Sequence, residues 1–557
     1  MRDKIIQFDK NDILKELEIE ALSSDGTGIA KIDGYPVFIK DALPGDTVTA
    51  KVMKAKKNMA FAKLLSVETP SPDRVTPKCS VTRPCGGCTL QELCYEKQLE
   101  YKDDKVYNAL LRIGGIPAKL LDKAHEDPIG MEKPWRYRNK AQYPVGRDKD
   151  GKIAAGFYAG RTHHIVETEE CYLNPPEFSA ILRSFLRFCE DNTIEPYDEV
   201  SGEGLVRHLV IRKAFATGEI MVMPVVTRLE GLSNKLREVL REALVGIPDL
   251  TTIVLNENPD NTNVILGRHI ETIYGNGYII DEMDGLKFNI SPLSFYQVNP
   301  VQALKIYDKA IEYANLTGSE KVYDLCCGIG TLSLLAARSA GKVYGIEILP
   351  EAIEDAKKNA KLNDIKNVKF TATAAEEYLP RIKDMKADVV ILDPPRSGME
   401  RLALDAIAKA SPARIVYVSC DPATQARDIK VFLASGYRLQ RFTVIDQFCH
   451  TSHVETVCIL SKLSSAKEHI EVTVDMDELD LTSAEAKATY NEIRDWVQEH
   501  YSMHVTNLNI AQVKQKHGII ERENYNKPKS PDSKQPQCPE EKIKAIEDAM
   551  RHFQMID

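Results

Sequence analysis

Between residues 294 and 463, short apolar runs alternate with segments of helical periodicity, and polar residues follow several of these runs. Strands that alternate with helices are typical of a parallel, doubly wound α/β sheet. The carboxyl ends of parallel strands meet at one edge, where such sheets bind ligands. The pattern therefore predicts a Rossmann-like domain with its site at that edge. The predicted strands cover residues 321–325, 342–347, 388–393, 414–419 and 457–460.

A glycine-rich turn, Asp324-Leu-Cys-Cys-Gly-Ile-Gly330, follows the first of these strands and precedes a helical run. Such a turn brings a ligand close to the backbone, although a tight structural turn has the same composition. Glu347 ends the next strand, where a carboxylate can hold both hydroxyls of a ribose. The third glycine of a dinucleotide fingerprint is absent, because Thr331, Leu332 and Ser333 follow. This favours S-adenosylmethionine, which has no pyrophosphate.

Two further strand ends carry candidate chemistry. Asp393-Pro-Pro-Arg396 is either a structural turn or a rigid acceptor that faces cofactor and substrate, since prolines end a strand. Cys420 follows the strand at 414–419 and is either an inert core thiol or a nucleophile. Its place beside the other strand-end motifs favours the nucleophile.

A thiolate at this edge suits the methylation of a pyrimidine carbon. Carbon 5 of uracil becomes nucleophilic after a thiolate adds to carbon 6, and it then attacks the methyl group of a sulfonium. A base must afterwards remove the proton on carbon 5. The segment 446–457 offers His450, His453 and Glu455 for that step.

The N-terminal region, from about residue 14 to residue 67, contains five short predicted strands separated by turn signals. This number of strands in so short a segment suits a small OB-type barrel. Residues 51–63 include five lysines and no acid. They indicate either a strand edge protected by charge or a face that binds phosphate.

Four of the twelve cysteines, Cys79, Cys85, Cys88 and Cys94, fall within 16 residues. The N-terminus has no apolar core, so we predict no secretory signal and expect a cytoplasmic protein. A metal site is then a better interpretation than disulfides. Spacing alone leaves open whether the fourth ligand is Cys94 or the distant Cys171, and whether the metal is zinc or an iron–sulfur cluster.

With these motifs in this order, the sequence closely resembles the RNA (uracil-5-)-methyltransferase family, in its bacterial branch with a TRAM domain and an iron–sulfur cluster. The resemblance covers about residues 8–463. The segments that carry it are Cys79-x5-Cys85-Gly-Gly-Cys88 with Cys171, Ser294-Phe-Tyr-Gln-Val-Asn299, the glycine-rich turn at 324–330, Asp393-Pro-Pro-Arg396, Ser419-Cys-Asp-Pro422 and His453-Val-Glu455.

The resemblance implies an enzyme that methylates carbon 5 of a uridine in structured RNA with S-adenosylmethionine. Cys420 is then the nucleophile and Glu455 the general base. The implied substrate is 23S ribosomal RNA, where that branch usually acts, with a transfer RNA as the alternative. The implied cofactor contacts are Gln297, Cys326, Glu347 and Asp393, and the implied ligands of a 4Fe-4S cluster are Cys79, Cys85, Cys88 and Cys171.

Three positions depart from the family pattern. The family usually has an aromatic residue at Cys326, which indicates a weaker packing contact on the cofactor. The family usually has Asn at position 421, where this chain has Asp. The charge of Asp421 is expected to raise the pKa of the adjacent Cys420. The family usually has Pro at Cys449. None of the three departures removes a catalytic group.

The segment 133–140, Lys-Pro-Trp-Arg-Tyr-Arg-Asn-Lys, interleaves four cations with Trp135 and Tyr137. Aromatic rings and cations together stack on unpaired bases and hold phosphates, whereas solvated strand charges are the simpler interpretation. We expect the target uridine to be single-stranded or flipped out, because a stacked base hides carbon 6. Further cations stand at Arg161, Arg207, Arg212 and Lys213.

We predict a multidomain α/β protein in four parts. The net charge is −9, of which −6 lies beyond residue 465, so total charge neither supports nor excludes a nucleic-acid partner. No run of 18 apolar residues occurs, which argues against a transmembrane helix. The parts are a TRAM or OB-like barrel at residues 1–68, a β-rich central domain with the iron–sulfur cluster at 69–290, the methyltransferase domain at 291–463 and a helical extension at 464–557.

The extension contains three predicted amphipathic helices, the first opened by a capping box at residues 482–485. It is either an RNA-binding accessory or a module that docks on protein. We favour docking, because its acidic balance opposes RNA. The residues that share apolar faces are Tyr490, Ile493 and Val497, then Ile543, Ile546, Met550 and Phe553, and the cations open to RNA are Lys514, Lys516, Lys527 and Lys529.

Two other functions fit part of this pattern. An amino-group methyltransferase uses acidic-Pro-Pro motifs like the one at Asp393, but that chemistry needs no thiol. An RNA-binding assembly factor on a methyltransferase scaffold needs neither Cys420 nor Glu455.

Overall fold

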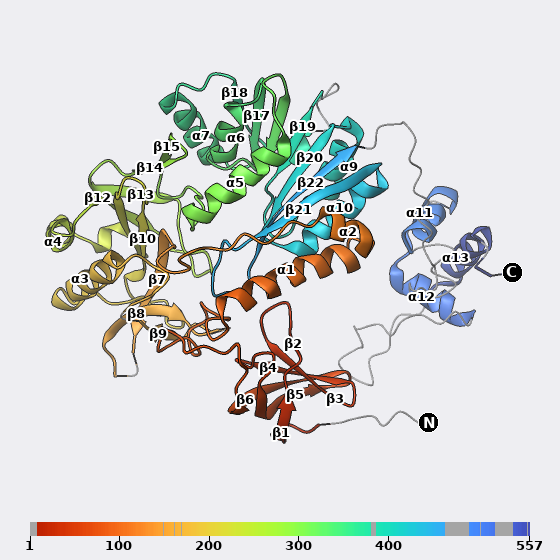
Figure 1. Ribbon diagram of the computed structural model, residues 1–557, viewed down its shortest axis with the longest axis horizontal. Helices are drawn as coiled ribbons and strands as arrows, with labels where there is room; N and C mark the ends of the chain where they lie inside the picture. The colour runs from red at the N-terminus through yellow and green to blue at the C-terminus, as the bar shows by residue number, and fades with distance from the viewer. Residues whose placement is uncertain are drawn as a thin grey trace. The chain divides into compact units, whose positions relative to one another are not determined.

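The computed structural model describes residues 8–148, 150–160, 162–168, 170–379, 386–462, 490–501, 503–517, 538–553 and 555–556 (Figure 1). The chain forms two compact units, Met1–Ser464 and Ser465–Asp557. Arg161, Lys527, Lys529 and the capping box expected at 482–485 lie outside the described residues. Within the described ranges, no helix is long and apolar enough to cross a membrane.

Six strands near the N-terminus form one sheet in the order β1-β5-β6-β4-β3-β2. Buried and more exposed residues alternate along β4 and β5, so their apolar side chains gather on one face and form a small core. Closure of this sheet into an OB-type barrel stays a prediction. The strands are β1 (Ile13–Glu18), β2 (Ala21–Leu22), β3 (Gly28–Ile32), β4 (Tyr35–Lys40), β5 (Thr47–Lys56) and β6 (Met59–Thr69).

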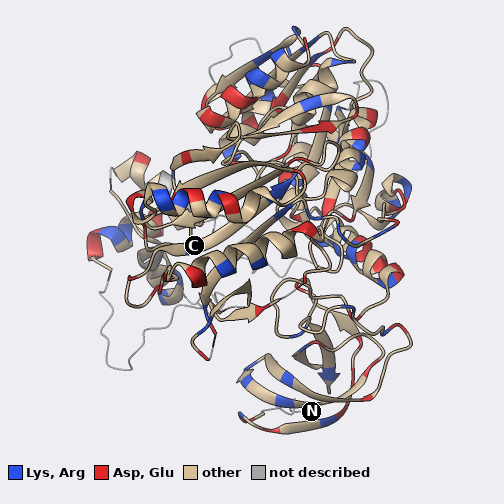
Figure 2. Cartoon of the chain, turned by 90° about the vertical axis from the view of Figure 1, so that its left-hand side faces the viewer, with Lys and Arg blue, Asp and Glu red and all other residues tan. Residues whose placement is uncertain are grey.

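The lysine-rich stretch at 51–63 is the hairpin of β5 and β6. Lys54, Lys56, Lys57 and Lys63 are exposed, and Figure 2 shows basic residues on the strands of this sheet. Phe38 and Phe61 stack nearby at a centroid distance of 5.4 Å. The hairpin therefore presents cations beside paired aromatic rings.

A second sheet has seven strands in the order β13-β12-β11-β10-β7-β8-β9. Helices α3 and α4 share one apolar core with it. The alternating segments predicted as strands near residues 205–212 and 219–226 are confirmed as β10 and β11. The elements are β7 (Lys140–Arg147), β8 (Ile153–Tyr158), β9 (Ile165–Glu167), α3 (Glu177–Asp191), β10 (Val206–Lys213), β11 (Ile220–Val226), α4 (Asn234–Val245), β12 (Leu250–Glu257) and β13 (His269–Tyr274), followed by the hairpin β14 (Ile279–Met283) and β15 (Leu286–Ile290).

The third large sheet has the order β18-β17-β16-β19-β20-β22-β21. All the predicted strands are present, but the sheet is not parallel throughout as the pattern indicates. β22 pairs antiparallel with both β20 and β21, because β21 returns directly through a loop instead of a crossover helix. The strands are β16 (Lys321–Leu325), β17 (Lys342–Glu347), β18 (Val368–Ala372), β19 (Val389–Leu392), β20 (Arg414–Ser419), β21 (Tyr437–Ile445) and β22 (Glu455–Lys462).

Helices cover both faces of this sheet (Figure 1). One core includes residues of α5 (Pro300–Ala314), α6 (Thr331–Ala337) and α7 (Pro350–Leu362). The opposite core includes residues of α1, α2, α8, α9 and α10. Helices α1 and α2 thus come early in the chain, yet they pack on the methyltransferase sheet. Their bounds are α1 (Tyr95–Arg112), α2 (Ala118–Ala124), α8 (Ala375–Tyr378), α9 (Arg401–Ala410) and α10 (Pro422–Ala434).

The second compact unit contains α11 (Tyr490–Tyr501), α12 (Asn507–Lys516) and α13 (Glu540–His552), close to the three helices that the sequence predicts. Its core includes Ile493, Val497, Ile546 and Met550, which confirms these four members of the expected apolar faces. Lys514 is 1% exposed, and Lys516 forms an ion pair with Glu547 at 2.9 Å. These two cations of the expected basic stretch are therefore engaged within the unit. Whether it docks on protein stays a prediction.

Candidate active site

The carboxyl ends of β16, β17, β19 and β20 lie at one edge of the methyltransferase sheet, and β22 begins at the same edge. The antiparallel ladder of β20 and β22 ends at the pair of Ser419 and Thr456; Cys420 follows Ser419, and Glu455 precedes Thr456. The charge of Glu455 contributes to the raised pKa of Cys420, so the two side chains are close in space. The predicted nucleophile and the predicted base are therefore neighbours.

The Cys420 thiol is half-buried at the end of β20. Burial raises the pKa of Cys420 to about 11, the carboxylate of Glu455 contributes to the increase, and the guanidinium of Arg396 opposes it. The free thiol is therefore protonated at neutral pH. Arg396 belongs to the Asp-Pro-Pro-Arg motif, and the sequence analysis did not assign it a part in the chemistry.

Asp421 is the N-cap residue of helix α10, and its carboxylate is hydrogen-bonded to the helix backbone. Its Oδ1 accepts hydrogen bonds from the N–H groups of Ala423 at 2.9 Å and Thr424 at 3.0 Å. A carboxylate at this position is stabilised by the helix dipole. The carboxylates that raise the pKa of Cys420 are instead Glu455 and Asp393.

Glu455 is the first residue of β22 and is 4% exposed. Burial raises the pKa of Glu455 well above its usual range, the charge of Asp393 adds to this effect, and Arg396 opposes it. A carboxylate with a raised pKa holds a proton more strongly than an exposed one does. The position therefore suits proton removal from carbon.

Two more acids lie at the ends of the neighbouring strands. Burial raises the pKa of Asp324 to about 7, and the Oδ2 of this residue accepts a 2.5 Å hydrogen bond from Ser333. Burial raises the pKa of Asp393 to about 7 as well, with a contribution from Asp324. This edge of the sheet is therefore rich in acids that share one environment.

Tyr307 of α5 lies among these acids, and the sequence analysis did not identify it. Burial raises the pKa of Tyr307 far above its usual range, and the charges of Asp393, Asp324 and Glu455 add to this. Its side chain is hydrogen-bonded to Gln297. Helical periodicity places Tyr307 on a buried face, but no pattern indicates that this face meets the strand ends.

The glycine-rich turn is shaped by its own packing. Cys326 has φ 68°, and the N–H groups of Cys326 and Cys327 donate to the carbonyl of Ile346 at 2.9 and 3.0 Å. Gly330 has φ 85°, and a Cβ there would come within 2.8 Å of the Phe370 ring. Gly330 is thus required by conformation and packing together.

Gly328 shows where the turn is open. A Cβ at Gly328 would meet nothing within 4 Å, although φ is 53°. Its N–H donates to Oε2 of Glu347 at 3.1 Å, and Oε1 accepts the N–H of Leu349 at 3.1 Å. These bonds fix the carboxylate of Glu347 beside the open turn, where the sequence predicts a ribose contact.

Gln297 connects the cofactor motif with the loop that precedes Glu455. Its carbonyl accepts a hydrogen bond from Asn139 at 2.9 Å, and its Oε1 accepts one from Gln447 at 3.2 Å. Asn299 caps α5 and donates to the carbonyl of Gln447 at 3.1 Å. The motif at 294–299 therefore lies against the loop at 446–454.

The four predicted cluster cysteines line one cavity of about 280 Å³, together with Arg138 and Lys140. Cys94 does not line it, and the thiol of Cys94 lies 3.9 Å from Oδ1 of Asp73 instead. In the described part of the chain, no three or more His, Cys, Asp and Glu side chains are grouped so that they could hold a metal ion. The cluster therefore stays a prediction. The cysteines of the cavity are Cys79, Cys85, Cys88 and Cys171.

Gly86 explains part of the cysteine spacing. A Cβ at Gly86 would lie 2.8 Å from the carbonyl oxygen of Tyr158, whereas one at Gly87 would make an ordinary contact with the Cys85 sulfur. Backbone of β8 thus approaches the segment between Cys85 and Cys88 too closely for any side chain. Only the first of the two glycines is required by this packing.

The aromatic residues expected to stack on RNA are engaged within the protein. Tyr137 is fully buried and donates to the carbonyl of Cys449 at 3.0 Å. Trp135 stacks on His450 at a centroid distance of 3.9 Å, and the ammonium group of Lys78 lies 4.6 Å from its ring centre. These residues support the loop at 446–454, and Tyr137 is not available to a base.

The other expected cationic positions are also largely internal. Arg207 donates to the backbone carbonyls of Asn258 and Asp260, and it is 4% exposed. Arg212 is 5% exposed on the same strand. Lys213 forms an ion pair with Glu177 at 2.7 Å. Among the described residues, the lysines of the β5–β6 hairpin are the better candidates for a phosphate-binding face.

Comparison with known proteins finds two matching families. Residues 282–463 match the family described as tRNA (Uracil-5-)-methyltransferase, and residues 15–65 match the TRAM domain. Curated relatives named uncharacterized RNA methyltransferases include one from Halalkalibacterium halodurans, 46% identical over 81% of this chain and 97% of its own. Another, from Bacillus cereus, is 44% identical over 82% of this chain and 98% of its own.

A solved structure has the same overall fold. It is the Pyrococcus abyssi tRNA (uracil-54, C5)-methyltransferase in complex with S-adenosyl-L-homocysteine, with a TM-score of 0.66 and 29% identity. The similarity covers 80% of this chain and 99% of the other.

The raised pKa of Cys420 predicts how this thiol reacts in the RNA-free enzyme. Alkylation by iodoacetamide follows the thiolate fraction, so its rate at Cys420 should rise about tenfold for each pH unit between pH 7 and pH 9. Mass spectrometry of the Cys420 peptide measures this rate. A plateau below pH 9 would show that the thiol ionises near neutrality and would contradict the prediction.

Proposed function

We propose that this chain, which belongs to the RNA (uracil-5-)-methyltransferase family, uses Cys420 and Glu455 to methylate carbon 5 of a uridine in structured RNA. The observation that carries this proposal is that both residues adjoin the last pair of the β20–β22 ladder, with the Glu455 charge acting on the Cys420 thiol. An S-adenosylmethionine-dependent RNA methyltransferase is what the family and the structural similarity show.

The proposed reaction begins and ends with Cys420 as a thiolate, and Glu455 takes up one proton. The Cys420 thiolate adds to carbon 6 of the uracil, and the ring electrons move to the oxygen on carbon 4 as an enolate. When bound, S-adenosylmethionine supplies the electrophilic methyl group, which carbon 5 attacks. Glu455 then takes the proton from carbon 5, and the carbon–sulfur bond breaks to release the Cys420 thiolate and 5-methyluridine.

The electrostatics of the edge support this assignment. Arg396 lowers the pKa of Cys420 and that of Glu455, so it favours the ionised form of both. The acids Asp324, Asp393 and Glu455 together suit a cationic sulfonium, because they offset its positive charge in a buried site. Glu347 is fixed beside the open turn at Gly328, where an adenosyl ribose would bind.

We propose 23S ribosomal RNA as the substrate and a transfer RNA as the alternative. The alternative is favoured by the similarity to the Pyrococcus abyssi enzyme, whose name specifies tRNA uracil-54. The exposed lysines of the β5–β6 hairpin, in the segment that matches TRAM, supply a face for RNA phosphates. Both substrates are cytoplasmic, so we propose that location for the enzyme.

Replacing Cys420 and Glu455 one at a time separates formation of the covalent adduct from the removal of the carbon 5 proton. Cys420→Ala should abolish methyl transfer, because no adduct at carbon 6 can form. Glu455→Gln should lower the rate by about 10²–10⁴-fold and accumulate a covalent complex with natural RNA, because the last proton stays on carbon 5. Denaturing gels and methyl-transfer assays measure both effects.

The control for this experiment is Cys189→Ala, which removes a buried thiol from α3 in the central sheet's core. Full activity of Cys420→Ala would favour an amino-group methyltransferase. Wild-type enzyme that binds RNA containing 5-fluorouridine without a covalent complex would favour an RNA-binding factor.

The substrate is decided by mapping 5-methyluridine in a strain that lacks the gene. We expect the modification to disappear from 23S ribosomal RNA and to persist in transfer RNA. Reintroduction of the wild-type gene should restore it, and reintroduction of the Cys420→Ala variant should not. Loss from transfer RNA alone would assign the alternative substrate.

We also propose that Cys79, Cys85, Cys88 and Cys171 bind a 4Fe-4S cluster with a structural role. Four thiols in one cavity supply the donors that such a cluster needs, and its ligands stand farther apart than those of a single ion. Arg138 lines the same cavity and offsets the negative charge of the thiolates. Methyl transfer exchanges no electrons, which favours a structural role.

The cluster proposal predicts brown protein with about four irons per chain after anaerobic purification. Cys85→Ser should lose iron and should impair folding or RNA binding more than cofactor binding. Cys94→Ser is the matched control and should keep its iron, because Cys94 does not line the cavity. A colourless protein with one zinc would overturn the proposal.

A further inference from the structure

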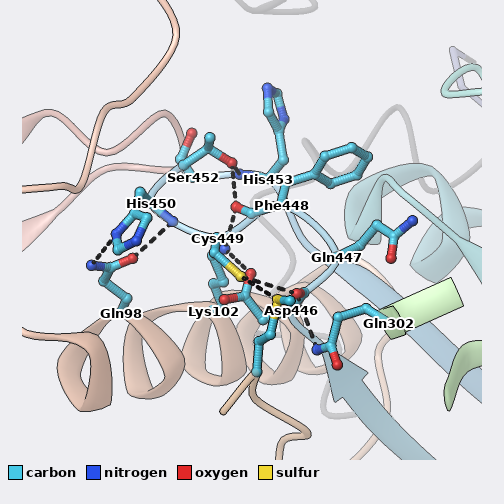
Figure 3. Close-up of polar contacts among 12 residues, drawn as sticks. Gln98, Lys102, Gln302, Asp446, Gln447, Phe448, Cys449, His450, Ser452 and His453 are labelled. Carbon is cyan, nitrogen blue, oxygen red and sulfur yellow. Dashed lines mark hydrogen bonds and ion pairs between the residues drawn. The ribbon is translucent and has the colours of Figure 1, made fainter. Parts of the chain in front are cut away.

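The loop between β21 and β22, residues 446–454, leads directly into Glu455; we call it the base loop (Figure 3). Glu455 pairs with Ile445 in the last step of the β21–β22 ladder, and Ser419–Thr456 is the last pair between β20 and β22. The ends of ladders open more easily than their centres. The contacts that hold the base loop in place therefore determine whether the last pair of the β21–β22 ladder stays formed.

A fully buried ion pair fixes the start of this loop. The ammonium group of Lys102, in the middle of α1, pairs with Oδ1 of Asp446, and neither side chain has any exposed surface. Lys102 also donates to the carbonyl of Phe448 at 3.0 Å. The hydroxyl of Tyr95 donates to Oδ2 of Asp446 at 2.8 Å, so both carboxylate oxygens have partners.

Other residues on the same face of α1 hold the rest of the base loop. The Gln98 side chain accepts the N–H of His450 at 3.0 Å and lies 3.2 Å from Nδ1 of its ring. His450 has φ 65°, a conformation that a non-glycine residue keeps only when its surroundings enforce it. Lys105 donates to the carbonyl of Ser452 at 2.8 Å.

The ion pair is not needed to attach α1 to the sheet. Val106 and Leu110 of α1 are fully buried in the apolar core beneath it and provide that attachment. Burying two charges is costly even when they are paired, and apolar residues stabilise such a position at least as well. Lys102 contacts both the Asp446 carboxylate and the Phe448 carbonyl, so its role is to specify the position of the base loop.

The position of Asp446 links the pair to the base. Asp446 follows Ile445 without an intervening residue, and Ile445 is the partner of Glu455. The backbone of Asp446 is also held, because its carbonyl accepts the side chain of Gln302 at 3.1 Å. Displacing Asp446 would therefore displace the last step of the ladder.

We propose that Lys102 and Asp446 are positioning residues, which hold the base loop so that the Glu455 carboxylate stays close to Cys420. This inference rests on the proposed role of Glu455 as the base. Neither residue touches the reacting atoms. The pair acts on proton removal and leaves the addition of Cys420 to the ring unaffected.

The experiment compares Lys102→Met with wild-type enzyme on natural RNA and on RNA containing 5-fluorouridine. With natural RNA, kcat should fall at least about tenfold, KM for RNA should stay within about twofold, and a covalent complex should accumulate. With 5-fluorouridine the complex should form at the wild-type rate, because that complex does not require proton removal.

A second variant removes the risk of an unpaired buried charge. Lys102→Met/Asp446→Asn leaves neither partner ionised, and it should show the same fall in kcat and the same accumulated complex. The matched control is Lys309→Met, since the recorded ion-pair partners of Lys309 are Glu126 and Glu312, outside the base loop. The control should keep wild-type kcat.

The outcomes separate this inference from the proposed function. Unchanged kcat in both Lys102 variants would overturn the positioning role and leave the function intact. An equal loss of complex formation, cofactor binding and thermal stability would show a general structural role and would also overturn it. Absence of the 5-fluorouridine complex with wild-type enzyme would overturn the proposed function itself.

Discussion

The reversed direction of β22 is the constraint on which the geometry of the site depends. In a fully parallel sheet, the first residue of this strand would lie at the edge opposite Cys420. Because β21 returns through the base loop, β22 runs antiparallel to β20 and begins where the other strands end. Cys420 and Glu455 consequently adjoin the last pair of one ladder, although they are 35 positions apart in the sequence.

This arrangement brings several acidic side chains together in a buried environment. Asp324, Asp393 and Glu455 all have raised pKa values because burial disfavours their charged forms. The same burial keeps the thiol of Cys420 protonated in the free protein. Arg396 opposes the increase in pKa at both Cys420 and Glu455. The Asp-Pro-Pro-Arg turn therefore contributes a cation as well as a carboxylate.

The base loop joins three regions that are distant in the sequence. Helix α1 contacts it through Lys102 and Gln98. The N–H of Leu90, two residues after Cys88, donates to the carbonyl of His450 at 2.9 Å, which brings the cysteine segment against the same loop. The motif at 294–299 reaches it through Asn299. A change in any of these regions therefore acts on the approach to Glu455.

Sequence alone determined five strands of the methyltransferase sheet and the residues at their ends, because apolar periodicity and motifs such as Ser419-Cys-Asp-Pro422 are local, but it missed β18 and β21. It also indicated Cys79, Cys85 and Cys88 by their spacing, while the family resemblance implied Cys171 as the fourth, and one cavity does bring these four together. The direction of β22 and the partners of Trp135 and Tyr137 were decided only by the tertiary structure. The same holds for Tyr307 and Lys102, since the burial of a polar side chain depends on contacts between segments hundreds of residues apart, such as Lys102 with Asp446.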